Sequence, residues 1–244
     1  MDVLKHLKLV VFFTRGISLQ IWDQVGMLER EVALYRQLLP HLKGITFLTY
    51  GDRSELQYAS CLNGIEILCN HWGLPQQLYT RLLPILHWRH LRQAHIFKTN
   101  QTEGSEVVLR AKRLFGKTMI TRCGYMWSLY FSQFEVNNIQ SSNAKAIINR
   151  EQQAFIHADQ VVVTTNQMKQ YAIKHYNLPS AKVQVIPNYT LTDTFKPYKT
   201  NSQTTQQRII YVGRFAPQKN PLGLLEAIRG LDVELVMIGE RAFA

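Results

Sequence analysis

Arg214 and Lys219 are the side chains whose type and spacing indicate the most specific chemistry in this sequence. They lie in the run 211–221, after an apolar stretch and before a segment that begins with proline. A strand expected over 208–212 ends at Gly213, where the backbone must turn tightly. Two cations beside the free N–H groups of a helix start can bind a diphosphate. A solvated loop with two ordinary surface cations is the alternative interpretation.

Several other chemistries lack their motifs. The loop matches neither the P-loop nor the G-x-G-x-x-G pattern, and the chain has no G-x-S-x-G element of a serine hydrolase. It also has no Asp-x-Asp pair, so we expect a diphosphate site that uses cations without a metal. His87, His90 and His95 are near one another in sequence, but no Cys or acidic ligand is close by, so no metal site is expected. The three cysteines form no C-x-x-C pair and are expected to be reduced.

Composition describes a globular chain with a basic balance. The 244 residues are 46% hydrophobic, which is enough for one complete core and a second, smaller one. The apolar run Leu9–Phe13 is too short for a signal peptide, and no run approaches a membrane span. We therefore expect a cytoplasmic protein. The net charge of +11 favours anionic partners, namely nucleotide phosphates, anionic lipid or nucleic acid.

Short apolar runs alternate with segments of helical periodicity over the first 190 residues. Strands are expected over 7–13, 45–50, 65–69, 95–99, 117–123, 160–164 and 182–187. Helices are expected over 28–42, 74–94, 103–115, 143–158 and 167–176. Pro84 predicts that the helix over 74–94 is in two pieces or kinked. This alternation predicts an α/β fold with a parallel sheet covered on both faces, and ligands then bind at the carboxyl ends of the strands.

The chain is expected to contain two domains. Residues 1–191 form the first, the polar stretch 192–207 is a linker, and 208–244 begins a second. The last part holds one strand–helix–strand unit, with its helix over 221–229 and its final strand over 233–238. Such a unit cannot bury both faces of its sheet, so we expect the chain to stop inside its second domain.

Three more stretches precede the cationic loop in a recognisable order. They are Glu151 with Ala158–Thr164, then Val183–Asn188, then Phe195–Pro197. With the loop, they resemble the retaining, sugar-nucleotide-dependent glycosyltransferases of family 4, which have the GT-B fold. The resemblance implies two Rossmann-like domains, with the acceptor on the N-terminal side and a nucleoside-diphosphate sugar bound by the C-terminal one. It implies sugar transfer to a hydroxyl of a saccharide or a lipid-linked glycan, with no cofactor.

The resemblance also assigns site residues. Arg214 and Lys219 would hold the diphosphate and neutralise the leaving group, and Gly213 would let the backbone approach it. The acceptor-side wall of the cleft would contain Gly16, Arg122 and Gly124. Asn188 and Glu151 are secondary candidates, with a turn former and a helix carboxylate as the alternative roles.

The sequence departs from the family pattern in three places. Only Gly16 remains of the N-terminal glycine-rich loop, and Arg122 stands where many members have a histidine. An arginine there can contact an anion but cannot act as a base, and pairing with a carboxylate is its alternative role. The family's later glutamate motif would lie beyond Ala244, so full donor binding by these 244 residues is not expected.

A basic segment suggests a further partner. Residues 81–122 carry nine Lys or Arg and two Glu, and apolar residues including Trp88 lie between the first three arginines. Such a segment can bind the inner face of an anionic membrane, although a helix packed on the sheet with solvated arginines explains it too. The competing function is a non-catalytic basic module for nucleic acid or anionic lipid. No nucleic-acid-binding motif supports it, so no nucleic-acid partner is expected. An inert truncated chain is a third alternative.

Overall fold

The computed structural model describes residues 4–133, 142–197 and 207–240. Within it, the chain forms two compact units, residues 1–191 and 192–244. Each unit is described by itself.

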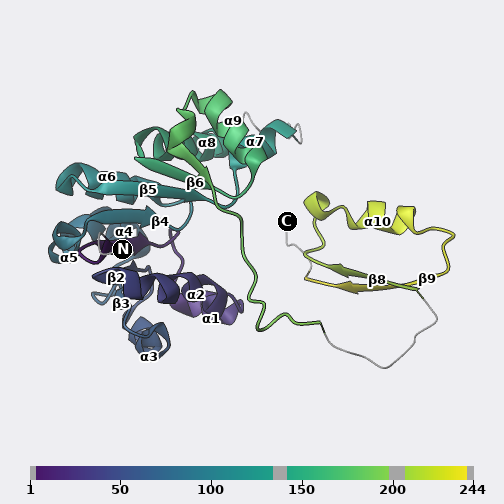
Figure 1. The fold of residues 1–244 in the computed structure, drawn as a ribbon, viewed down its shortest axis with the longest axis horizontal. Helices are drawn as coiled ribbons and strands as arrows, with labels where there is room; N and C mark the ends of the chain where they lie inside the picture. Colours follow the sequence, from purple (N-terminus) through teal and green to yellow (C-terminus); the bar gives the residue numbers. More distant parts are fainter. Residues whose placement is uncertain (1–3, 134–141, 198–206, 241–244) are drawn as a thin grey trace. The chain divides into compact units, whose positions relative to one another are not determined.

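A parallel sheet of seven strands, ordered β3-β2-β1-β4-β5-β6-β7, forms the first unit (Figure 1). Its strands are β1 (Lys8–Phe12), β2 (Gly44–Leu48), β3 (Glu66–Leu68), β4 (Ile96–Thr99), β5 (Thr118–Cys123), β6 (Gln160–Val163) and β7 (Val183–Val185). All seven are expected from the sequence, with shorter bounds here. The predicted α/β fold with a parallel sheet is confirmed.

Helices cover both faces of this sheet. They are α1 (Leu19–Gln24), α2 (Leu28–Leu38), α3 (Ala59–Leu62), α4 (Gln76–Leu86), α5 (Trp88–Gln93), α6 (Ser105–Phe115), α7 (Trp127–Gln133), α8 (Ser142–His157) and α9 (Asn166–Tyr176). Short 3-10 turns are Leu39–His41, Arg53–Tyr58 and Ser180–Lys182. Figure 1 shows α8 and α9 on one side of the strands and α1 and α2 on the other. None of these helices combines the length and hydropathy that crossing a bilayer requires, in the part of the chain described.

Successive side chains along a strand point to opposite faces of the sheet, so the first unit has two separate hydrophobic cores. In β1, Val10 and Phe12 point to the face covered by α4, α5, α6, α8 and α9. Leu9 and Val11 point to the opposite face, where α1 and α2 add Trp22 and other buried side chains. A strand buried on both faces is a continuous apolar run, which explains why the sequence revealed these strands.

The break in the predicted helix 74–94 lies at His87 rather than at Pro84. Pro84 is inside α4, where it has no N–H to donate to the carbonyl of Thr80. Arg110 of α6 takes over that carbonyl, since its Nη2 donates to Thr80 O at 2.6 Å. The proline is tolerated because a neighbouring helix satisfies the acceptor it leaves open.

The stretch between the expected strand 7–13 and the expected helix 28–42 contains the short helix α1. Ser18 caps it, because its Oγ accepts a hydrogen bond from Ile21 N at 3.1 Å. The fully buried Glu55 accepts two more at the same end, from Leu19 N at 2.8 Å and Gln20 N at 3.1 Å. A carboxylate 35 residues away thus stabilises this helix start.

The second unit contains a parallel pair of strands and one helix. Its elements are β8 (Gln207–Val212), a 3-10 turn (Pro217–Lys219), α10 (Pro221–Ala227) and β9 (Val233–Ile238). Ala216 is the one buried residue among those described in this unit, and Val212 is 75% exposed. A strand–helix–strand unit of this size buries little apolar surface by itself.

Stability should depend on pH through His87. This side chain is buried with its Nε2 2.8 Å from Tyr79 Oη, and burial lowers its pKa from 6.5 to about 4. Between these values the unfolded chain binds the proton and the folded chain does not, so acidification lowers the free energy of unfolding. Urea unfolding at several pH values from 7 to 4 should show that the free energy of unfolding falls more steeply for the native protein than for His87→Gln. Parallel curves would contradict this assignment.

Candidate functional site

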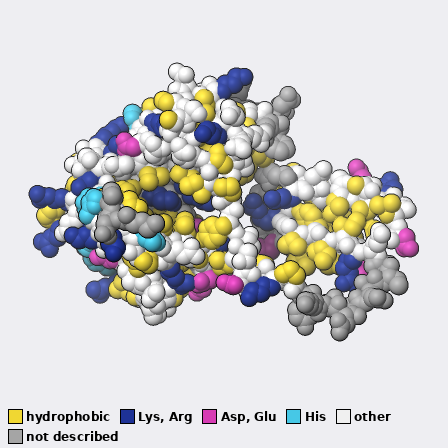
Figure 2. Space-filling view, in the orientation of Figure 1, with side chains coloured by type: hydrophobic (Ala, Val, Ile, Leu, Met, Phe, Trp, Pro, Cys, Tyr) yellow, Lys and Arg dark blue, Asp and Glu magenta, His cyan; other side chains and the backbone are white. Residues whose placement is uncertain are grey.

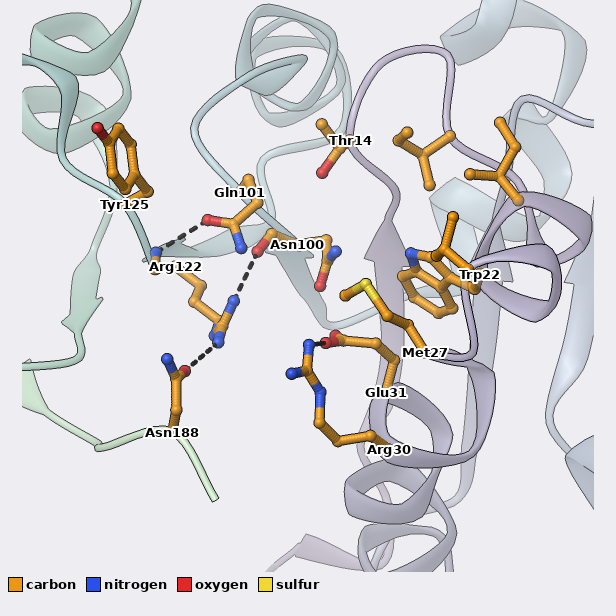
Figure 3. A pocket seen from close by; sticks show the side chains of 14 residues that line it. Thr14, Trp22, Met27, Arg30, Glu31, Asn100, Gln101, Arg122, Tyr125 and Asn188 are labelled. Atoms are coloured by element: carbon orange, nitrogen blue, oxygen red, sulfur yellow. Dashed lines mark hydrogen bonds and ion pairs between the residues drawn. The ribbon is translucent and has the colours of Figure 1, made fainter. Parts of the chain in front are cut away.

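A pocket of about 360 Å³ opens where the strands of the first unit end (Figure 3). Its lining comes from the segments after β1, β4, β5 and β7 and from α1 and α2. These segments are far apart in sequence, but the carboxyl ends of parallel strands meet at one edge. The pocket is therefore at the place where an α/β sheet binds its ligands.

Arg122 is the centre of the polar wall. Its Nη2 donates to Asn188 Oδ1 at 2.9 Å, and its Nη1 is 3.4 Å from the carbonyl of Asn100. Beside it, Gly124 N donates to Gln101 Oε1 at 2.8 Å. Figure 3 shows Arg122, Gln101 and Asn188 together. The structure thus brings together three residues singled out from the sequence: Arg122, Gly124 and Asn188.

No ion pair of Arg122 occurs among the described residues, so the carboxylate partner considered for it is not seen there. An amide oxygen and a carbonyl oxygen orient the guanidinium, and neither neutralises its charge. A cation held in this way can bind an anionic or strongly polar ligand group.

The apolar wall was missed by sequence reasoning. It consists of Ile17, Ile21, Trp22, Val25 and Met27 from α1 and its flanks. The ring of Trp22 is 4% exposed and stacks on Phe13 at 4.1 Å, which fixes this wall. The spacing 17, 21, 25 and the capping Ser18 are the sequence features that could have revealed it.

Further charges lie in and near the pocket. Arg30 and Glu31 form an ion pair of 2.6 Å on the side of α2. Lys98 does not line the pocket, but it interacts electrostatically with Arg122 and Glu31, and its Nζ donates to Tyr35 Oη at 2.8 Å. Burial, together with the nearby Arg122, lowers the pKa of Lys98 to about 7. The described residues in and next to the pocket therefore have more positive than negative charge near neutral pH.

Gly16 does not line the pocket, although Thr14 and Ile17 on either side of it do. Its φ is +78°, and a Cβ there would approach Gln76 Nε2 to 2.8 Å. The left-handed φ favours glycine here, whereas the flexible end of Gln76 could move away from a Cβ. The neighbouring Arg15 is held by ion pairs with Glu106 and, at 3.6 Å, Glu103.

Glu151 is also outside the pocket lining and is 1% exposed. It accepts hydrogen bonds from Trp127 N at 2.8 Å, from Tyr176 Oη at 2.7 Å and from Ser128 Oγ. Burial raises the pKa of its carboxyl, against the effect of these donors. This carboxylate therefore positions the start of α7.

The cations of the second unit lie on the segment that follows β8. Arg214 and Lys219 are both exposed, and the carbonyl of Arg214 accepts from Tyr211 Oη at 2.8 Å. The backbone of Gly213 contacts Gly239, where an added Cβ would come within 1.8 Å of Gly213 O. An added Cβ at Gly213 itself makes only ordinary contacts, at 3.5 Å. The backbone approach at this strand end thus requires glycine at 239.

No group of three potential metal ligands occurs in the described residues. The three histidines considered from the sequence each have a separate contact. His87 contacts Tyr79, His90 lies 3.1 Å from Glu66, and His95 Nδ1 accepts from a backbone N–H.

Three solved structures are similar to this chain in fold. The chain matches Anabaena Alr3699/HepE in complex with UDP-glucose with a TM-score of 0.60 and 15% identity, over 98% of this chain and 62% of that one. It matches sucrose-phosphate synthase (tll1590) from Thermosynechococcus elongatus with a TM-score of 0.65 and 14% identity, over 96% and 62%. It matches the lipopolysaccharide outer core galactosyltransferase WaaB with a TM-score of 0.52 and 12% identity, over 95% of this chain and 60% of that one.

These likenesses define the fold as GT-B, and the chain spans about three fifths of the length of these proteins. The sequence profile of Glycosyltransferase Family 4 matches residues 44–192, more than half of the chain. The chain therefore belongs to Glycosyltransferase Family 4. A search of curated proteins gave no match.

Removing the carboxylate of Glu151 should destabilise the first unit. Glu151→Ala leaves three donors without their acceptor, and we expect a loss of about 2–3 kcal/mol in the free energy of unfolding. Glu151→Gln should recover part of it. Urea unfolding measures both, with Glu29→Ala, which removes an exposed pair with Arg36, as a control within about 0.5 kcal/mol. Equal stability of Glu151→Ala and the native protein would disprove the positioning role.

Proposed function

We propose that this chain supplies the acceptor side, and part of the donor side, of an enzyme that transfers a sugar from a nucleoside-diphosphate sugar to a hydroxyl. The acceptor is a saccharide or a lipid-linked glycan, the anomeric configuration is retained, and no metal takes part. The observation that carries this proposal is the family match over 44–192, a segment that supplies most of the polar wall of the pocket, including Arg122, Gly124 and Asn188.

The pocket of the first unit suits a hydroxyl acceptor. Its polar wall contains the side chains of Asn100, Gln101 and Asn188. These amides can donate hydrogen bonds to sugar hydroxyls and accept hydrogen bonds from them. Arg122 adds a fixed positive charge for a phosphate or another polar group of the acceptor. The apolar wall around Trp22 provides contact area for the remainder of the molecule.

The donor diphosphate is assigned to the second unit. Departure of a nucleoside diphosphate builds up negative charge, and fixed cations stabilise that charge most in the transition state. Arg214 and Lys219 are exposed after β8, close in sequence to the start of α10. HepE has been crystallised with UDP-glucose, which supports a nucleotide-sugar donor here.

Replacing either cation should weaken donor use. Arg214→Ala or Lys219→Ala, in the complete natural polypeptide, should raise the KM for the donor or lower kcat at least tenfold, about 1.4 kcal/mol. Donor hydrolysis across a panel of sugar nucleotides measures this, and assays in EDTA test the proposed independence from metal.

The control is Arg208→Ala, because Arg208 is paired with Glu234 on β8–β9. It should leave both constants within twofold. Native kinetics in the two loop variants would refute the diphosphate assignment. Affinity for random DNA rivalling that for the donor would favour the nucleic-acid-binding alternative.

We also propose that the first unit binds the inner face of an anionic membrane, so that the protein is cytoplasmic and peripheral. Arg81, Arg89 and Arg92 are exposed on α4 and α5 and belong to no ion pair within the described residues. Between them, Ile85 is 63% and Trp88 is 45% exposed. Figure 2 shows Lys and Arg beside hydrophobic side chains at the end of the unit where α5 lies. Cations around apolar groups attract such a surface.

Neutralising these arginines should abolish membrane binding. The triple change Arg81, Arg89 and Arg92 to Ala should reduce co-sedimentation with phosphatidylserine vesicles at low salt at least tenfold, since each cation adds about 1 kcal/mol. The matched control changes three exposed cations elsewhere in the unit, at Lys43, Arg53 and Lys174. An equal loss of vesicle binding in the two triple variants, or no vesicle binding by the native protein, would disprove the proposal.

A further inference from the structure

Four aromatic rings gather on the surface just after β5. They belong to Tyr125, Trp127, Tyr130 and Phe131, which we call the aromatic cluster. Ring centroids lie 4.8 Å apart for Tyr125 and Trp127 and 5.7 Å apart for Trp127 and Phe131. Tyr125 is 45% and Trp127 is 36% exposed, although large rings gain free energy by burial. Exposed aromatic groups of this kind mark binding sites.

Buried polar contacts hold the cluster in place. Glu151 accepts from Trp127 N and from the Ser128 hydroxyl, so the first turn of α7 is fixed from below. Met126 and Ser128 are buried beneath it. The hydrogen bonds to the buried Glu151 therefore hold the backbone of the cluster in place while its rings remain exposed. A surface fixed in advance loses little entropy when it binds.

The aromatic cluster continues the wall of the pocket. Tyr125 lines the pocket together with Arg122 and Gly124, and Figure 3 shows its ring on the same side as Arg122 and Gln101. A ligand that fills the pocket and extends past Tyr125 would meet Trp127 next. The guanidinium of Arg122 and the amide of Gln101 in the pocket are thus followed by the aromatic ring of Trp127.

We propose that the aromatic cluster is a saccharide subsite, which binds the sugar units of an oligosaccharide acceptor next to the unit in the pocket. The inference rests on the proposed function, because it takes the pocket as the acceptor site. The C–H face of a pyranose packs against an aromatic ring, while its hydroxyls bond to amides and guanidinium groups such as those of Gln101 and Arg122. The acceptor is then at least two sugars long.

A membrane is the less suitable occupant of this surface. An anionic bilayer needs cations beside apolar groups, and such a surface lies on α4 and α5. α5 leads into the start of β4, whereas α7 follows the carboxyl end of β5, and Figure 1 shows the two helices at opposite ends of the unit. The two surfaces are separate and chemically different.

The test is binding of the 244-residue chain to a printed array of defined oligosaccharides of two to eight sugars, without donor. The native chain should bind at least one oligosaccharide family, and Trp127→Ala should weaken that binding at least tenfold. Trp127→Phe keeps a ring and should lose less than threefold. Trp72→Ala removes a tryptophan of similar exposure, 41% against 36% for Trp127, that does not line the pocket, and it should bind as the native chain does.

Other results would overturn the subsite. One such result is that Trp127→Ala binds oligosaccharides as well as the native chain does, and another is that the native chain binds none of them. A third is that Trp127→Ala loses binding to phosphatidylserine vesicles but not to oligosaccharides. Thermal unfolding verifies that each variant is folded, and Tyr125→Ala provides a second test if Trp127→Ala is not. Donor hydrolysis in the complete polypeptide distinguishes the two proposals, because it should survive Trp127→Ala and fail with Arg214→Ala.

Discussion

The structure depends on one constraint, the common direction of seven parallel strands. Because every strand ends at the same edge, residues from the ends of β4, β5 and β7 meet although up to 88 positions separate them, as from Asn100 to Asn188. The hydrogen bond from Arg122 to Asn188 joins two of these ends. A pocket with one polar and one apolar wall follows from that arrangement.

Much of this could be predicted from the sequence. Strands buried on both faces are continuous apolar runs, and their order along the chain predicts the parallel sheet and its ligand edge. Arg122, Gly124 and Asn188 were identified through a family resemblance and do lie together. The same resemblance placed Gly16 in the cleft wall and made Glu151 a secondary candidate, and neither lines the pocket.

The remainder depends on contacts that no local pattern reveals. The helix α1 is too short for a strong periodic signal, and its start is stabilised by Glu55 from a distant turn. α7 likewise begins where Glu151, 24 residues away, accepts its first N–H. In both cases a buried carboxylate far along the chain places a short helix, one that forms part of the pocket wall and one that adjoins it. Sequence reasoning finds long periodic elements and misses elements set by tertiary hydrogen bonds.

The most direct test of the central claim is a crystal structure of the complete natural polypeptide with a nucleoside diphosphate and an oligosaccharide bound. Diphosphate oxygens should lie within hydrogen-bond distance of Arg214 and Lys219, and a sugar unit should lie between Arg122 and Trp127. A diphosphate bound elsewhere while both cations face solvent, or a saccharide outside the pocket of the first unit, would disprove these assignments.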